Sequence, residues 1–445
     1  GTTVIGNNTT ASIDFQGALY SFGTGTTNIE AQSGETIDVT KNTTTVEFKT
    51  SGTSISFDTA EIDLEDGSNI SIASSGGAIS VVGIAGTSSE TVSISANDGV
   101  AHGGDGDSSN ETVTIGDIGH ATVDEILSVS ITGADGITLN ASNINTADDT
   151  NPNISFTGAV TISGSVEVSS DNENNDGTIG FSSTIDGAGG TDNLTVLSGS
   201  GSPTFSGVIG DATALNNLSI NATDTDSSDG ATAALTIPTI GDSDGTPSAG
   251  ANIVTIGSSD TASVTFGGDY YGTDGNFVVT ATSGTDKITF NGVSTTVTTS
   301  GDLVDLNSGV KLGNINTLTI NTNTGNALDS GGNVEIAGAI AGTSNENLTI
   351  TTGNKDGSDD PGSVTFSGNV GAASGVASQI STLTVNAATS ITVGGDIVTS
   401  GADGDSSNPD VLLTGPVVLS GNTSIVTDVG GATDGDITIT GTLDG

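Results

Sequence analysis

Short acidic segments, in which aspartates alternate with small polar residues, are the part of this chain best suited to chemistry. The clearest are DGDSSNE (105–111), DTDSSDG (224–230), GDSDG (241–245) and DGDSSNPD (403–410). Carboxylate and hydroxyl oxygens at alternate positions are ligands that calcium prefers. We therefore predict calcium binding within these segments, with the candidate ligands Asp105, Asp107, Asp224, Asp226, Asp242, Asp244, Asp403 and Asp405.

None of these segments completes a known calcium loop. An EF-hand would need glycine at position six and glutamate at position twelve, and the repeated nonapeptide of calcium-binding solenoids is also missing. The alternative is that the acidic segments are solvated loops whose charge prevents lateral aggregation. Calcium is the one cofactor that the sequence predicts.

Catalytic residues are scarce. The two histidines, His102 and His120, lie outside any nucleophile elbow or metalloprotease motif, and the chain has no cysteine. The one pair of adjacent aromatic residues, Tyr270 and Tyr271, could form a carbohydrate platform or pack against the fold. We predict that the protein is not an enzyme.

The composition excludes several partners. The net charge is −48, with 53 acidic residues and five lysines and no arginine, so nucleic acids and anionic membranes find few cationic contacts. No apolar run approaches the roughly 20 residues of a membrane span. Because the chain contains no methionine, we expect it to be a processed protein or a window of a longer one.

The elements that must position these segments are short strands. Aliphatic residues alternate with Thr or Ser at 112–115, 160–162, 317–320, 347–351, 382–385 and 437–440, with Gly, Asn and Asp between these runs. Helical periodicity is nearly absent. A recurring aliphatic-x-Phe-x-Gly motif, as at 154–158 and 264–268, places the aliphatic residue and Phe on one strand face and Gly at a turn or bulge.

Internal similarity predicts repeats of about 100 residues. NPNISFTGAVTISGSVEV (151–168) aligns with NPDVLLTGPVVLSGNTSIV (408–426), and DNLTVLSG (192–199) resembles ENLTITTG (346–353). We assign repeat units to 88–187, 188–290 and 344–445. Residues 1–87 form an N-terminal β region of similar texture, and 291–343 form a divergent β segment.

Two all-β architectures fit such repeats. The first is a right-handed parallel β-solenoid (β-helix), with turns of roughly 20 residues around a narrow aliphatic core. The second is a row of tandem Ig-like β-sandwiches. Hydrophobic residues make up 32% of the chain, aromatic residues only 3%, and tryptophan is absent, so we predict the solenoid.

Strings such as STIDGAGGTDNLTVLSG (183–199) and TFSGVIGDATALNNLSINAT (204–223) resemble the repeats of giant secreted bacterial surface proteins, the filamentous-haemagglutinin-like and autotransporter-like adhesins. The resemblance covers most of 88–290 and 344–445. It implies an extended β-solenoid shaft outside the cell.

The sequence thus predicts a structural, non-enzymatic subunit or repeat region of an extracellular filament, sheath or adhesin shaft at the cell surface. We expect self-association into a fibre or surface layer, contact with surface glycans, and neither nucleic-acid binding nor membrane insertion. A glycan- or cell-binding adhesin module and a β-helical polysaccharide-active enzyme are the alternative hypotheses.

Overall fold

The computed structural model describes most of the chain and divides it into two compact units. Unit 1 comprises Gly1–Gly207, and unit 2 comprises the described residues of Val208–Thr223 and Ala233–Gly445. The structure describes all residues except 42–43, 66, 88, 98–109, 120–125, 147–151, 171–175, 222–233, 242–249, 314–316, 324–330, 344–345, 353–361, 372–378, 388, 401–409 and 428–434.

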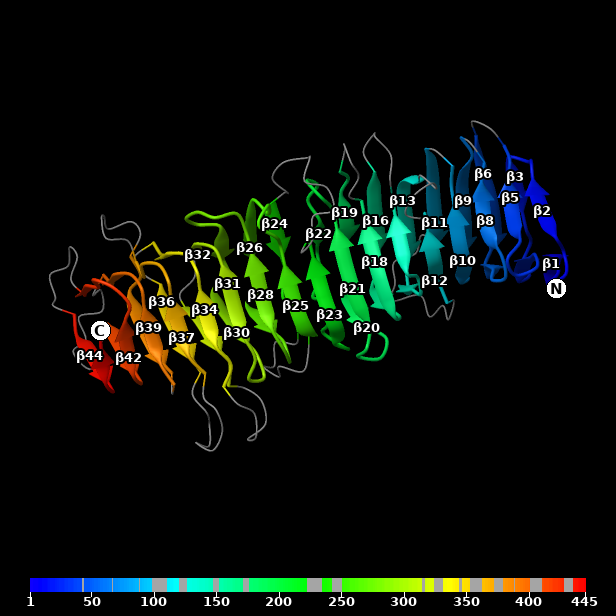
Figure 1. The fold of residues 1–445 in the computed structure, drawn as a ribbon. Helices are drawn as coiled ribbons and strands as arrows, with labels where there is room; N and C mark the ends of the chain where they lie inside the picture. Colours follow the sequence, from blue (N-terminus) through cyan, green and yellow to red (C-terminus); the bar gives the residue numbers. More distant parts are fainter. Residues whose placement is uncertain are drawn as a thin grey trace. The chain divides into compact units, whose positions relative to one another are not determined.

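Unit 1 is a stack of turns whose strands form three parallel ladders (Figure 1). Ladder 1 contains β1 (Thr3–Gly6), β4 (Thr27–Glu30), β7 (Ile55–Phe57), β10 (Ile79–Ala85), β12 (Thr112–Ile118), β14 (Gly136–Leu139), β17 (Val160–Ile162) and β20 (Ile185–Gly187). Ladder 2 contains β2 (Ser12–Phe15), β5 (Thr36–Val39), β8 (Glu61–Leu64), the ends of β10 and β12, β15 (Asn143–Asn145), β18 (Ser165–Ser169) and β21 (Asn193–Leu197). Ladder 3 contains β3 (Leu19–Ser21), β6 (Thr45–Ser51), β9 (Asn69–Ser75), β11 (Glu90–Ala96), β13 (Ile126–Gly133), β16 (Asn153–Thr157), β19 (Ile179–Phe181) and β22 (Thr204–Phe205).

Unit 2 has the same organisation, and its chain visits ladders 4, 5 and 6 in turn. Ladder 4 contains β27 (Tyr270–Gly272), β30 (Ser294–Thr298), β33 (Thr317–Asn321), β36 (Asn347–Thr351), β38 (Thr382–Asn386), β41 (Val411–Thr414) and β44 (Ile437–Thr440). Ladder 5 contains β23 (Leu215–Ile220), β25 (Ala251–Ile256), β28 (Phe277–Thr280), β31 (Val304–Asn307), β34 (Val334–Ile336), β37 (Val364–Phe366), β39 (Ile391–Val393), β42 (Val417–Leu419) and β45 (Leu443–Asp444). Ladder 6 contains β24 (Ala234–Ile237), β26 (Ser263–Phe266), β29 (Ile288–Phe290), β32 (Val310–Leu312), β35 (Ile340–Ala341), a bridge at Val370, β40 (Ile397–Val398) and β43 (Ile425–Val426).

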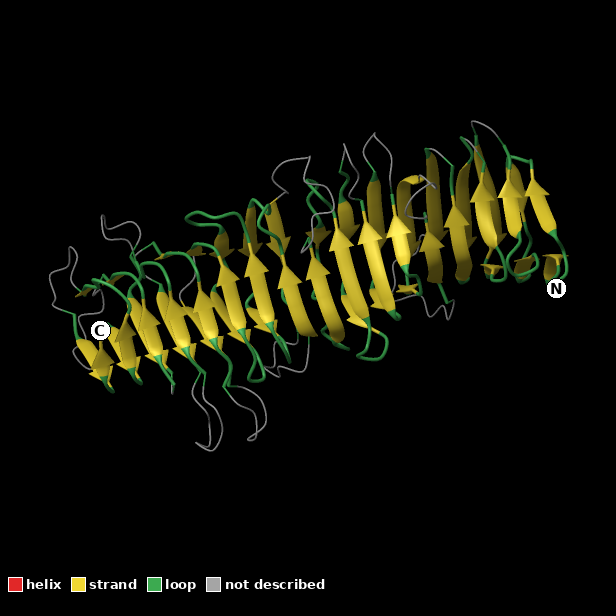
Figure 2. Ribbon diagram, viewed as in Figure 1, coloured by secondary structure: helices red, strands yellow, loops and turns green. Residues whose placement is uncertain are grey.

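This arrangement confirms the predicted parallel β-solenoid. The described residues are strands and loops without a helix (Figure 2), and every described strand pairing is parallel. The tandem sandwich alternative is therefore wrong, because a sandwich is built from antiparallel sheets. The six strands predicted from alternation are all observed, the first as the longer β12.

The turns are longer than the roughly 20 residues that we expected. Thr3 pairs with Thr27, and Ile137 pairs with Val160, so these turns take 24 and 23 residues. Three strands and three corners need this length, because each corner adds residues that pair with no ladder. The repeat boundaries inferred from the sequence stay a prediction.

The core of each unit is a set of aliphatic columns. Strand burial alternates, and inward residues lie directly above one another in register; Ile137, Val160 and Ile185 are one such column in unit 1, each at most 1% exposed. Adjacent strands lie about 4.8 Å apart, so branched side chains in consecutive turns are in van der Waals contact. A narrow core of this kind needs few large side chains.

The aliphatic-x-Phe-x-Gly motif lies where the prediction placed it. In unit 1, the Phe181 ring stacks between Phe156 and Phe205 with centroid distances of 4.9 and 5.5 Å. In unit 2, Phe266 stacks on Phe290 at 4.8 Å. The glycine that follows is required: Gly158 has a φ of +129°, and a Cβ there would lie 2.2 Å from a backbone oxygen of the preceding turn.

Buried hydroxyls close the bases of several corner loops, and we call these contacts hydroxyl latches. The Ser198 hydroxyl donates to the Gly201 carbonyl at 2.8 Å, and that of Ser170 to Gly177 at 3.1 Å. In unit 2, the Thr322 hydroxyl donates to the Gly332 carbonyl at 2.7 Å. The latched residues are three to ten positions apart in sequence, so one contact closes loops of very different length.

Phe181→Ala should destabilise unit 1, because it removes the middle ring of the stack and leaves a cavity. A buried Phe→Ala change costs about 3–5 kcal/mol, and in a stacked fold the loss is local. Urea unfolding with hydrogen exchange of ladder 3 would measure it. Thr161→Ala, an outward position on β17, is the control. A loss for Phe181→Ala no larger than that of the control would contradict this account of the core.

Candidate functional site

The predicted calcium ligands lie outside the described residues. Asp105 and Asp107 belong to 98–109, which joins β11 to β12, and Asp224 and Asp226 belong to 222–233, which joins β23 to β24. The segments 242–249 and 401–409 also lie outside the described residues, and they contain Asp242, Asp244, Asp403 and Asp405. The same is true of His102 and His120, which belong to 98–109 and 120–125. Calcium binding by these segments stays a prediction.

In the part of the chain that the structure describes, no group of three or more His, Cys, Asp or Glu side chains could hold a metal ion. The densest row of carboxylates is an in-register column on ladder 2: Asp14 pairs with Asp38, and Asp38 with Asp63. This column was not predicted from the sequence, although its aspartates are spaced by about one turn. Two of its members accept local hydrogen bonds, Asp14 from Thr40 and Asp38 from Thr36, both at 2.6 Å.

Two buried carboxylates of unit 1 accept hydrogen bonds from backbone amides. Glu90 is 0% exposed and accepts the amides of Gly67 at 2.9 Å and Thr87 at 3.0 Å. Asp192 is 5% exposed and accepts the amides of Gly164 and Gly189, both at 2.7 Å. Each carboxylate thus satisfies one amide of its own turn and one of the preceding turn.

Glu346 in unit 2 makes the own-turn part of this arrangement. It is 2% exposed, and its Oε2 accepts the amide of Thr343 at 2.6 Å while its other oxygen accepts the Thr343 hydroxyl. In all three cases a donor lies three residues before the acid, as in Thr87-x-x-Glu90. This spacing was present in the sequence and could have identified the three acids as loop-closing groups.

Half-buried Asn and Asp side chains connect consecutive turns in a similar way. The Asn369 side chain accepts the amide of Asp396 at 2.9 Å, and the Asp396 carboxylate accepts the amide and hydroxyl of Ser424, both at 2.8 Å. The hydrogen bonds from the Ser424 amide and hydroxyl lower the pKa of the Asp396 carboxyl below its usual range. These side chains extend the backbone ladders around a corner.

The tyrosine pair does not form an accessible carbohydrate platform. Tyr271 is 0% exposed; its ring meets Phe266 edge-on at 4.8 Å, and its hydroxyl accepts the Gly268 amide at 2.7 Å. Burial raises the pKa of the Tyr271 hydroxyl above its usual range. Tyr270 is 7% exposed and shares a hydrogen bond with Thr298 at 2.9 Å. Both residues lie within strand β27 and are buried, so the pair packs against the fold, which was the second of the two expectations.

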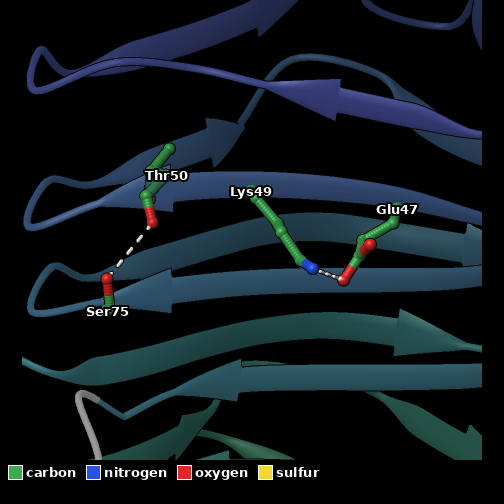
Figure 3. Close-up of polar contacts among 4 residues, drawn as sticks. All are labelled: Glu47, Lys49, Thr50 and Ser75. Atoms are coloured by element: carbon green, nitrogen blue, oxygen red, sulfur yellow. Dashed lines mark hydrogen bonds and ion pairs between the residues drawn. The ribbon is translucent and has the colours of Figure 1, made fainter.

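Two of the lysines in the described part of the chain form ion pairs with nearby acidic side chains. Lys49 pairs with Glu47 on the outward side of β6, next to a contact in which the Ser75 hydroxyl donates to the Thr50 carbonyl at 3.5 Å (Figure 3). Lys311 lies 3.9 Å from Asp286, and both side chains are about 40% exposed. Exposed pairs of this kind contribute little stability.

Comparisons with protein-family models, with curated proteins and with solved structures found no significant match to this chain. Among the described residues, no helix is long and apolar enough to cross a membrane. The strand topology places the chain in the class of parallel β-solenoids.

Asp192→Ala should destabilise unit 1, because it removes the carboxylate that accepts hydrogen bonds from the amides of Gly164 and Gly189. We expect a loss of about 1–3 kcal/mol in the free energy of unfolding. Asp192→Asn keeps one acceptor oxygen and should lose less. Denaturant titration of the three proteins measures the difference; equal losses for Ala and Asn would show that the hydrogen bonds are not responsible.

Calcium in excess should raise the melting temperature relative to chelator, because ligands that bind only the folded state stabilise it. Replacing Asp403 and Asp405 with Asn should reduce this difference if 401–409 is a site. Magnesium at the same ionic strength is the control for charge screening. Identical melting in calcium, magnesium and chelator would remove the calcium prediction.

Proposed function

We propose that this chain is a structural, non-enzymatic subunit or repeat region of an extracellular filament, sheath or adhesin shaft. The observation that carries the proposal is the continuity of three parallel ladders within each unit. The buried acids Glu90, Asp192 and Glu346 support it, because they are used to close turns. Buried carboxylates in a catalytic site would instead face a substrate cavity.

The direction of the backbone hydrogen bonds would let the stacked turns of each unit resist extension. In a parallel ladder these bonds join each turn to the next, so within a unit they lie along the direction of stacking. Pulling two turns apart must break the bonds of three ladders together, as well as separate the aliphatic columns. Such an element resists extension without needing a wide core or disulfide bonds.

An extracellular position is also a proposal. It is supported by the resemblance to secreted surface-protein repeats and by a net charge of −48, which favours solubility. A shaft of this kind would hold glycan-binding parts away from the cell. The glycan-binding module and the enzyme remain alternatives with less support, because neither Tyr270 nor Tyr271 is available for sugar stacking.

Self-association end to end is the partner proposal, and unit 2 supplies its support. Val411 and Val417 are 0% exposed, but their register partners one turn later, Ile437 and Leu443, are 45% and 53% exposed. Ile437 and Leu443 therefore form an exposed apolar surface in the described structure. We propose that this surface contacts a second copy of the chain, which makes a head-to-tail contact that repeats.

The wild-type chain should form linear assemblies that lengthen with protein concentration. The double variant Ile437→Asp, Leu443→Asp should shorten them, because carboxylates would be buried at each junction. Electron microscopy and sedimentation would measure length. Ile253→Asp, which changes an exposed apolar residue on β25, is the control and should not alter assembly. A wild-type chain that remains unassembled at every concentration would refute the self-association proposal.

A further inference from the structure

We propose that the outward face of ladder 4 is a lateral docking surface for the same face of a second copy of this chain. This inference deepens the proposed function, since it concerns contacts between shafts rather than between their ends. We call the surface the hydroxyl face; it consists of the outward positions of β30, β33, β36, β38 and β41. On the first four of these strands, seven of the eleven outward residues that are not buried are threonine, and the others are asparagine or serine.

The hydroxyl face differs from the other described faces in its charge. No strand of ladder 4 contains Asp, Glu or Lys. Each of the other five ladders carries at least one charged side chain at an outward position: Asp186, Asp14, Glu47, Asp305 and Lys311 on ladders 1, 2, 3, 5 and 6 respectively. Because each copy has a net charge of −48, two copies repel least where they meet through this neutral face.

The geometry of the hydroxyl face also suits mating with itself. Thr319 pairs in register with Thr349, and Thr349 with Thr384, so identical side chains repeat once per turn. These three side chains are half-buried and make no side-chain hydrogen bond within the described part of the chain. Stacked identical residues on a regular parallel sheet are the pattern that interdigitates between paired sheets.

The size of the hydroxyl face predicts a weak contact. Its five strands, spaced about 4.8 Å apart and about five residues long, give a surface of about 24 by 17 Å, or about 400 Å² on each copy. A buried total near 800 Å² is below the size of standard specific interfaces and in the range of weak, transient ones. In a linear assembly the same contact would recur on every subunit, so lateral association strengthens by multivalency.

Paired substitutions on the hydroxyl face test the proposal. Thr349→Asp with Thr384→Asp would place four like charges at a self-mated interface, so the dimer dissociation constant should rise by about 100-fold or more. Thr365→Asp with Thr392→Asp is the matched control: these threonines are in-register outward neighbours on ladder 5, and dimerisation should change by no more than about twofold. The two variants should have the same melting temperature, so that a difference in dimerisation cannot come from unfolding.

The measurement is sedimentation equilibrium in the Ile437→Asp, Leu443→Asp background, which removes end contacts and leaves lateral ones. Dimerisation should increase with salt, because screening weakens the repulsion between acidic copies. The lateral proposal is overturned if this protein is monomeric at all concentrations and salt levels, or if both Asp pairs weaken the dimer equally. Loss of linear assemblies alone would overturn only the head-to-tail proposal.

Discussion

Parallel pairing between consecutive turns is the constraint on which the rest of each unit depends. Every turn must return its three strands to the same register, or the aliphatic columns and the backbone ladders are lost together. The corners show how this is achieved. Gly158 allows the backbone to approach the turn before it, and the Asn369 and Asp396 side chains accept amides of following turns. The strands provide the pairing, and the corners maintain the register.

The acidic composition has two separate physical uses in the described residues. Buried acids such as Asp192 accept hydrogen bonds from backbone amides at turns. Outward acids such as Asp38 and Asp305 give the strand faces negative charge, which opposes contact with other acidic molecules. The first use concerns folding and the second solubility, and neither needs a substrate. A strand face without outward acids therefore lacks this repulsion.

Much of the fold could be predicted from the sequence, because alternation and glycine spacing are local signals. The Phe motif, the strand at 347–351 and the parallel solenoid follow from them directly. Turn length was underestimated, because residues in corners follow no period. The environment of Tyr270 and Tyr271 could not be read from the sequence, since burial of a Tyr-Tyr pair depends on neighbours one turn away. The roles of Glu90 and Asp192 depend on the same non-local contacts.

The hydroxyl latches have a consequence for how this fold can vary. A latch such as Thr322 to Gly332 joins the two ends of a loop at its base, so this contact helps to fix where the next strand begins. Ser198 and Gly201 form the same contact around a much shorter loop. Length and composition can therefore change between latched residues at little thermodynamic cost to the ladders. We therefore expect the latched corners to accept grafted peptides with little effect on the ladders.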